Sequence, residues 1–249
     1  ARHQTNRIML DLCADIIVNV SGSGYLMQMG TMNSQGVGNP PRNITKYGNG
    51  LFNPSGDNTG FTGTVSIVEG TINPGAISAF GPAYVGAVVV SNGGTLLLQR
   101  NMRSKPYTFM GSGSGNTGCL LIAGANISFT DQYAITLGAD VTFGLHDGAR
   151  TLTLANSITG DYGILKLGPG TLKLDTNNYF TGDLTQNGGT LYVNRPNQYR
   201  QFTILNGTAY LNGSNTNTAV RTIALGGTVI FSNDYNLSDG PASFDISNI

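Results

Sequence analysis

Residues 166–191 read KLGPGTLKLDTNNYFTGDLTQNGGTL, and residues 46–72 read KYGNGLFNPSGDNTGFTGTVSIVEGTI. The two stretches follow one pattern, with a single residue deleted in the later copy. Such self-similarity is typical of repeat architectures, in which one unit cannot bury its apolar face alone and stacks on its neighbours. The shared positions are Lys46, Gly48, Gly50, Asn58, Phe61, Thr62, Gly63, Gly70 and Thr71, matched by Lys166, Gly168, Gly170, Asn178, Phe180, Thr181, Gly182, Gly189 and Thr190.

A shorter pattern, Gly-Thr followed by alternating apolar residues, recurs along the chain. Its last four copies begin 19, 18 and 20 residues apart. That spacing is too short for a propeller blade and suits one coil of a β-solenoid. The copies begin at Gly70, Gly94, Gly170, Gly189, Gly207 and Gly227.

One coil can be read from its residues. The run Thr171-Leu172-Lys173-Leu174 alternates polar with apolar, so every second side chain faces one buried side of a strand. Glycine before the strand gives the backbone the freedom that a corner needs. At about 20 residues per coil the chain makes about a dozen coils, and no run has convincing helical periodicity. The sequence predicts an all-β parallel β-helix, or β-solenoid.

The alternation also predicts the side chains of the interior stack, each of which contributes about 1.5–3 kcal/mol when fully buried. The predicted pairs are Val65 and Ile67, Leu96 and Leu98, Leu120 and Ile122, Ile127 and Phe129, Leu152 and Leu154, Leu165 and Leu167, Leu172 and Leu174, Leu191 and Val193, and Val229 and Phe231.

The composition is poor in charge. Charged residues are 10% of the chain, against about 25% in a usual domain, and the formal net charge is +0. A charge balance of this kind gives no sign of nucleic acid or of an anionic membrane as a partner. It fits a molecule packed against copies of itself, and it also fits the ordinary composition of secreted bacterial repeat proteins.

The pattern K-x-G-x-G-T-L-x-L, then N-x-(Y/F)-T-G, then a strand and G-G-T-L-x-V, carries a family resemblance. It is similar to the autotransporter-associated β-strand repeat of type V secretion passengers and other large bacterial surface proteins. Residues 166–193 match it closely, and residues 46–72 match with a degraded middle. The resemblance implies a right-handed parallel β-helix exported to the bacterial cell surface, and it implies no particular ligand.

Residues 1–20 differ from the rest because strict alternation continues over residues 8–20. This length is unusual for a strand. Three interpretations stay open: a cap on the first coil, an arm that joins another copy head to tail, or two short strands bent around a corner. The apolar face that would make the joint is Ile8, Leu10, Leu12, Ala14, Ile16, Val18 and Val20.

Residues 21–249 are predicted to form a single solenoid domain, with loop excursions near 21–43 and 100–118. The first residues lack the apolar core of a signal peptide, so we expect export to be directed by sequence outside these residues. No run of apolar residues is long enough for a membrane-spanning helix.

The two cysteines, Cys13 and Cys119, allow two interpretations. A disulfide between them would join the N-terminal segment to the rod, but sequence alone cannot establish that the two residues are close, and two separate thiols are the favoured interpretation. With only His3 and His146 beside them, they make no credible zinc site.

An enzyme must be weighed, because parallel β-helices host polysaccharide lyases and hydrolases, which need clustered carboxylates. The densest cluster is His146, Asp147 and Arg150, with Asp131 and Asp140 upstream. An Asp-Gly pair is more often a turn, and there is no Trp to stack on a sugar. Calcium-binding repeat motifs are absent as well. The prediction is a chain without catalysis, metal or cofactor.

The sequence therefore predicts a secreted or surface-displayed structural solenoid. Its first predicted role is self-assembly with copies of itself into an extracellular fibre, sheath or layer. The alternative is an adhesin passenger that binds a receptor or a glycan along its flank, and a polysaccharide-degrading enzyme is the least favoured.

Overall fold

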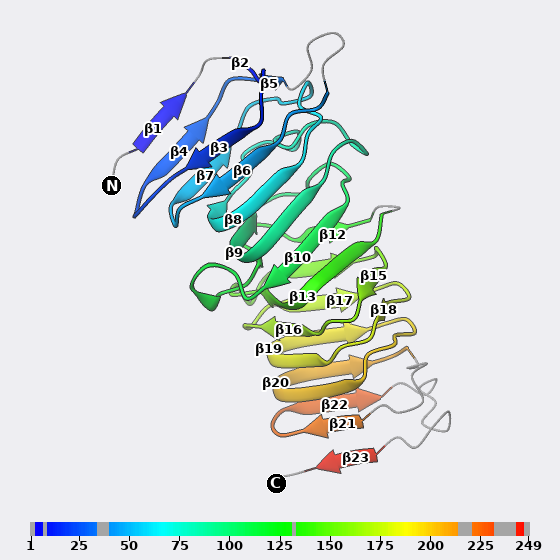
Figure 1. Ribbon diagram of the computed structural model, residues 1–249. Helices are drawn as coiled ribbons and strands as arrows, with labels where there is room; N and C mark the ends of the chain where they lie inside the picture. The colour runs from blue at the N-terminus through cyan, green and yellow to red at the C-terminus, as the bar shows by residue number, and fades with distance from the viewer. Residues whose placement is uncertain are drawn as a thin grey trace.

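The computed structural model describes residues 3–6, 9–33, 40–130, 133–213, 221–231 and 243–246. These residues form parallel strands stacked in about ten turns. The one helical element among them is a single 3₁₀ turn, η1 (Ser114–Asn116). Figure 1 shows a rod with the two termini at opposite ends. The predicted β-solenoid is confirmed.

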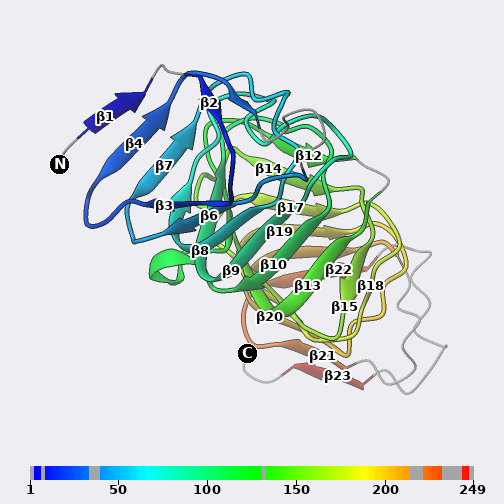
Figure 2. The ribbon, with the colours of Figure 1, turned by 45° about the horizontal axis from the view of Figure 1, so that its top comes forward.

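The strands form three parallel ladders, here called faces A, B and C, and the later turns pass through all three (Figure 2). The side chains buried between these faces are mostly apolar. In the described residues, face A consists of β3 (Ile16–Asn19), β6 (Ile44–Tyr47), the first parts of β8 (Val65–Ile72), β9 (Val88–Leu98) and β13 (Ile135–Gly144), with β10 (Tyr107–Gly111), β15 (Ile158–Gly160) and β18 (Tyr179–Phe180).

Face B runs the whole length of the rod. It consists of β1 (His3–Asn6), β4 (Tyr25–Gln28), β7 (Leu51–Pro54), the second parts of β8, β9 and β13, β11 (Leu120–Ile122), β16 (Ile164–Leu167), the first parts of β19 (Leu184–Val193) and β20 (Gln201–Leu211), β21 (Arg221–Ala224) and β23 (Ser243–Ile246).

Face C closes the later turns. It consists of β12 (Ile127–Phe129), β14 (Thr151–Leu154), β17 (Thr171–Leu174), the second parts of β19 and β20, and β22 (Thr228–Phe231). At the N-terminal end β2 (Leu10–Asp11) and β5 (Met32–Asn33) form a separate parallel pair.

The strands stack in register, so like positions lie directly above one another. Leu152 pairs with Leu172 and Leu172 with Leu191, and all three are fully buried. Their neighbours in the sequence point outward, because side chains alternate across a strand. The interior stack supplies most of the stability of such a rod, since no turn can bury its apolar side chains alone.

Most of the predicted interior pairs are buried, but Leu165 and Leu167 are not. In β16 the buried residues are Ile164 and Lys166, so the predicted register is wrong by one residue, which moves every side chain to the opposite face. The prediction chose the two leucines as the interior pair, whereas the structure buries the lysine between them. Val229 and Phe231, near the C-terminal end, are only partly buried.

The N-terminal segment is the first turn of the solenoid. Instead of one long strand it contains β2 and β3, separated by a bend in which the backbone N–H of Asn43 donates to the Asp15 carboxylate at 2.9 Å. Of the predicted apolar face, Val20 is buried, Leu10, Leu12, Ile16 and Val18 are half-buried, Ala14 is exposed, and Ile8 lies outside the described residues.

The two predicted loop excursions also contain strands. The described residues of the stretch 21–43 include β4 and β5, which belong to the second turn. The stretch 100–118 is interrupted by β10, and its Lys105 is buried, donating to the carbonyl of Val85. Both predictions of a loop are therefore too broad, because Gly- and Ser-rich sequence can still pair in a stacked turn.

Candidate binding groove

A groove of about 800 Å³ follows the corner at which face A passes into face B. Successive turns each contribute residues to this corner, so the groove runs along the axis of the rod. Its polar and aromatic lining includes Asn92, Ser112, Asp140, Asp161, Tyr162, Thr181, Asp183 and Arg200.

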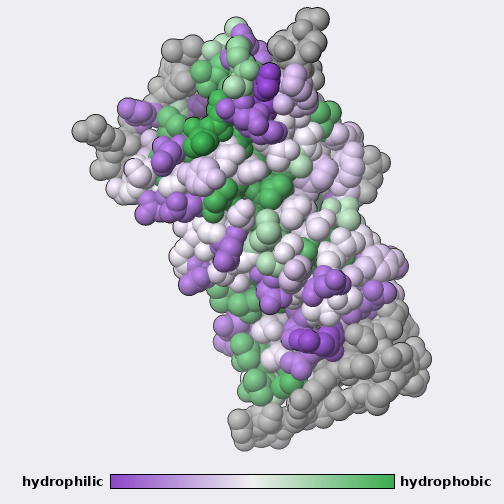
Figure 3. All heavy atoms as spheres, viewed as in Figure 1, coloured by the Kyte–Doolittle hydropathy of each residue, from purple (hydrophilic) through white to green (hydrophobic). Residues whose placement is uncertain are grey.

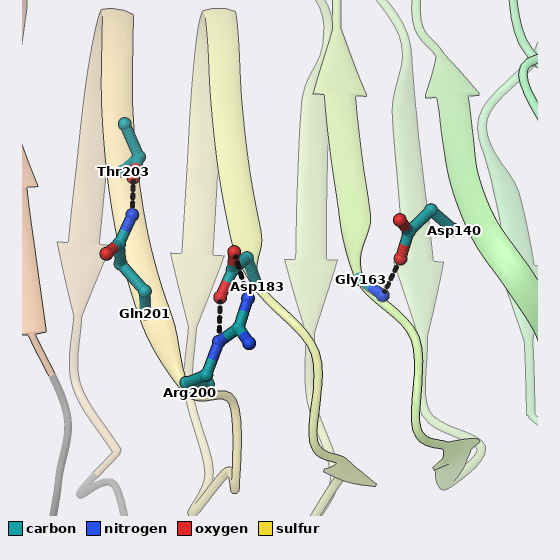
Figure 4. Close-up of polar contacts among 6 residues, drawn as sticks. All are labelled: Asp140, Gly163, Asp183, Arg200, Gln201 and Thr203. Atoms are coloured by element: carbon teal, nitrogen blue, oxygen red, sulfur yellow. Dashed lines mark hydrogen bonds and ion pairs between the residues drawn. The ribbon is translucent and has the colours of Figure 1, made fainter.

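The stacking register brings the acidic residues of the groove together. Val141, Ile164 and Leu184 lie in one ladder, so the residues directly before them, Asp140 and Asp183 among them, meet at the same corner. The N–H of Gly163 donates to Asp140 at 2.7 Å and fixes that carboxylate against the next turn (Figure 4).

Glycine allows the turns to approach closely under the groove. A Cβ atom added at Gly182 would lie 2.2 Å from the backbone carbon of Tyr162, a distance that no side chain tolerates. A residue larger than glycine would push the two turns apart, and the floor of the groove depends on this contact.

One ion pair crosses the groove. The Arg200 guanidinium donates two hydrogen bonds to Asp183, from Nε to Oδ1 and from Nη2 to Oδ2, each at 2.9 Å (Figure 4). The hydrogen bond and the charge of Asp183 raise the pKa of Arg200. Bidentate pairs fix the planar guanidinium in one orientation, although this one is exposed and contributes little to stability.

The remaining polar groups are open to solvent. Asp161 accepts a hydrogen bond from the Thr181 hydroxyl at 3.1 Å, and Tyr162 is 42% exposed. With Asp140, Asp161 and Asp183 against one arginine, the groove carries excess negative charge. Figure 3 shows hydrophilic side chains gathered over β18 to β20 and hydrophobic ones over β3 and β6.

The cluster of His146, Asp147 and Arg150 that was weighed for catalysis does not form a joint site with Asp140. Asp147 accepts from the N–H of Ala149 and from Arg150 Nε, each at 3.0 Å, which is a turn closed by an ion pair. These contacts lower the pKa of Asp147, the Ala149 N–H most. Asp140 lies at the other end of the extended segment 141–144, and Asp131 falls outside the described residues.

His146 takes part in neither group. Its Nε2 lies 2.8 Å from the carbonyl oxygen of Thr117, and the side chain is exposed. Across the described part of the chain no group of three or more His, Cys, Asp or Glu side chains is placed to hold a metal ion.

Both cysteines are free thiols, so the possible disulfide is not formed. Cys13 is exposed in the first turn. Cys119 is buried, its Sγ donates to the Thr142 carbonyl at 3.3 Å, and burial raises its pKa to about 12. A thiol in this environment stays protonated and unreactive.

Sequence reasoning missed the groove. The tripeptide Thr-Gly-Asp occurs at 159–161 and again at 181–183, and the groove is lined by Asp161 of the first copy and by all three residues of the second. This repeat was a usable signal. The contribution of Arg200 has no comparable signal, because only the stacking places it against Asp183.

Comparisons with known proteins give one informative relative. The chain is 30% identical over 110 residues to the adhesin BmaC autotransporter of Brucella suis biovar 1 (strain 1330). The match covers 42% of this chain and 3% of that protein, so the chain spans a small fraction of its relative. No family model and no solved structure matches the chain. The described residues include no helix long and apolar enough to cross a membrane.

Proposed function

We propose that this chain is a non-catalytic β-solenoid displayed outside a bacterial cell, where it works as an adhesin-type passenger and binds a receptor or glycan along its flank. The observation that carries the proposal is the polar groove that successive turns build along the rod. The likeness to an adhesin autotransporter supports the same function.

The rod suits this work for a physical reason. Parallel turns in register form one continuous stack of about ten turns, so a flank residue keeps its position relative to its neighbours. Binding groups on such a scaffold lose little conformational freedom when a partner docks. A stiff flank with repeated corner residues therefore favours recognition of an extended partner.

The same groups give little support to catalysis. Asp147 and Arg150 satisfy each other in a turn, and Asp183 is paired with Arg200. A glycosidase needs an acid and a base across one bond, with the pKa of the acid raised. The pKa of Asp147 is lowered instead. We expect no release of unsaturated or reducing sugars from acidic glycans, with or without Asp147→Ala.

The experiment is saturable binding of the fluorescently labelled chain to epithelial cells and to bacterial cells. Leu172→Asp is the control, because it places a carboxylate in the interior and should unfold the turns around it. Saturable binding by the folded chain alone supports the proposal. Binding no greater than that of Leu172→Asp contradicts it.

A second candidate is the self-assembling homopolymer. The observation that favours it is the open edge of the first turn: β1, β2 and β3 each pair with one neighbour only in the described residues. Ile17, on this edge, is 70% exposed. An unprotected parallel edge can accept a strand from another copy.

A further inference from the structure

We infer that the groove at the corner of faces A and B binds a linear glycan of pyranose sugars that carries no acidic group, aligned with the axis of the rod. The inference rests on the proposed function and names the ligand class of its flank.

The shape of the groove comes first. Its lining passes from Asn92 through Ser112, Asp140 and Asp161 to Arg200, which belong to successive turns. Stacked turns are spaced by ~4.8 Å, so the groove is a long channel with one set of polar groups per turn. An extended chain of pyranose rings has a repeat close to this spacing, and successive sugars can meet equivalent groups on successive turns.

The polar groups match hydroxyls. Asp140 and Asp161 each accept one hydrogen bond from the protein at Oδ1, from the Gly163 N–H and from the Thr181 hydroxyl. Each carboxylate keeps a second oxygen that can accept from a ligand hydroxyl. Sugars present adjacent hydroxyls, which suit the two oxygens of a carboxylate, and hydrogen bonds to charged groups are the stronger ones.

Tyr162 adds an aromatic surface between the acidic residues. Its ring is exposed in the groove although the residue lies beside the tightly packed Gly163 and Gly182. Tyrosine offers an apolar face with a polar tip and loses little conformational entropy on binding. The face suits the C–H groups of a pyranose ring.

The charge of the groove decides the class of glycan. Arg200 is neutralised by Asp183, which leaves Asp140 and Asp161 without a matching cation in the lining. A uronic acid or a sulfated sugar would place like charge beside them, at a cost in affinity. Neutral or amino sugars meet no such repulsion.

The test is a calorimetric titration of the full chain with three soluble oligosaccharides: an N-acetylglucosamine oligomer (neutral), its deacetylated form (cationic) and a hyaluronan oligomer (acidic). Asp161→Asn and Tyr162→Ala are the groove variants. Tyr179→Ala is the matched control, because Tyr179 is an exposed tyrosine outside the groove. Circular dichroism checks that each variant is folded.

We expect binding of the neutral and cationic oligomers, weakened about tenfold or more by Tyr162→Ala, weakened by Asp161→Asn, and unchanged by Tyr179→Ala. The inference is overturned by preference for hyaluronan, by no binding of either non-acidic oligomer, or by binding that both groove variants leave intact.

If labelled chain binds cells and Tyr162→Ala binds them equally, the groove inference fails while the proposed function stands. If the folded chain binds no cells, the proposed function itself fails.

Discussion

The ammonium of Lys166 lies 2.5 Å from the carbonyl oxygen of Gly188, which belongs to the next turn, and 2.5 Å from that of Gly168 in its own. The side chain is fully buried. Lys46, at the equivalent position of the earlier copy, donates to Tyr47 at 2.8 Å, to Gly48 at 2.5 Å and to Glu69 at 3.2 Å. The repeat lysine thus joins the corner carbonyls of two turns.

Replacing Lys166 by methionine should destabilise the rod by about 2–4 kcal/mol, because at least two partly buried carbonyls lose their donor. Lys166→Gln should cost much less. The next turn already has Gln186 above Lys166 in register, where its amide donates to Gly189 at 2.9 Å and to Thr208 at 3.1 Å. Urea unfolding, followed by circular dichroism, measures the free energy of unfolding of both variants. An equal loss of this free energy in the two variants would show that a hydrogen-bond donor at position 166 is unimportant.

Stability should rise as the pH increases through the range just above 8. Burial lowers the pKa of Lys46, Lys105 and Lys166 to about 8 each, against about 10.4 in an unfolded chain. Between these values the unfolded state binds more protons than the folded state, so the free energy of unfolding increases with pH.

Cys119 acts in the opposite direction, because its raised pKa of about 12 makes the unfolded state release the thiol proton first. The measurement therefore uses the Cys119→Ala variant, which lacks this opposing effect. Its free energy of unfolding in urea is compared at pH 7.5 and pH 9.5, with and without Lys166→Gln. The increase in this free energy with pH should be smaller when Lys166→Gln is present. A free energy of unfolding that is flat or falls over this interval in Cys119→Ala contradicts the buried ammonium groups.

The two thiols should differ sharply in reactivity. Cys13 is exposed and should be alkylated by iodoacetamide in the native chain, whereas Cys119 is buried and should react only after unfolding. Mass spectrometry of the native and denatured reactions distinguishes the sites. Faster migration on a non-reducing gel, with neither thiol alkylated after unfolding, would show that a disulfide joins the two cysteines.

If the chain polymerises, the joint should be the open edge of the first turn. The N–H groups of Ile16 and Val20 bond the second turn at 2.9 and 3.1 Å, so alternation points the N–H of Ile17 away from the stack. Ile17→Pro should then abolish polymers while leaving the fold intact. Val18→Pro is the contrasting variant, because its N–H faces the second turn and the fold should suffer.

Polymer formation is measured by light scattering across concentration. Polymers of Ile17→Pro that match those of the unmodified chain would exclude this edge as the joint. The apolar residues first predicted for the joint, such as Leu10 and Val18, face the interior of their own turn, so the prediction now concerns the backbone edge and Ile17.

Two neighbouring asparagines should respond differently to alanine. Asn178 is buried: its Oδ1 accepts from the Ile158 N–H at 3.0 Å, and its Nδ2 donates to Thr176 at 2.9 Å and to Asn197 at 3.0 Å. Asn178→Ala should cost about 1–3 kcal/mol for the groups left unpaired. Asn177 is exposed, and its alanine variant should stay within about 0.5 kcal/mol. If the two variants lost the same stability in thermal unfolding, the assignment of Asn178 to the interior and Asn177 to the surface would be wrong.

The sequence predicted the fold class because its strongest signals are local. Gly-Thr corners and alternation at Leu172 and Leu174 depend only on nearby residues, and the structure buries both leucines. The predicted register is wrong at β16. Hydrophobicity alone favours burial of Leu165 over Lys166, but carbonyls of two turns stabilise the buried ammonium of Lys166. A hydrogen-bond partner about twenty residues away cannot be predicted from the local alternation of residues.

The groove was beyond prediction for a related reason. Asp140, Asp161 and Arg200 are far apart in the sequence, and only the length of each intervening turn decides whether they share a corner. Turn length varies along this chain, so counting residues does not place them. The bend between β2 and β3 was likewise hidden, because alternation continues through it although the strand does not.

The most direct test of the account is electron microscopy of the purified chain across a range of concentrations. About ten turns at ~4.8 Å each predict isolated rods about 50 Å long, with the same length at every concentration, as a displayed binding passenger requires. Regular filaments at all concentrations would contradict the adhesin-type function and favour the homopolymer. Compact particles without an elongated axis would contradict the solenoid itself.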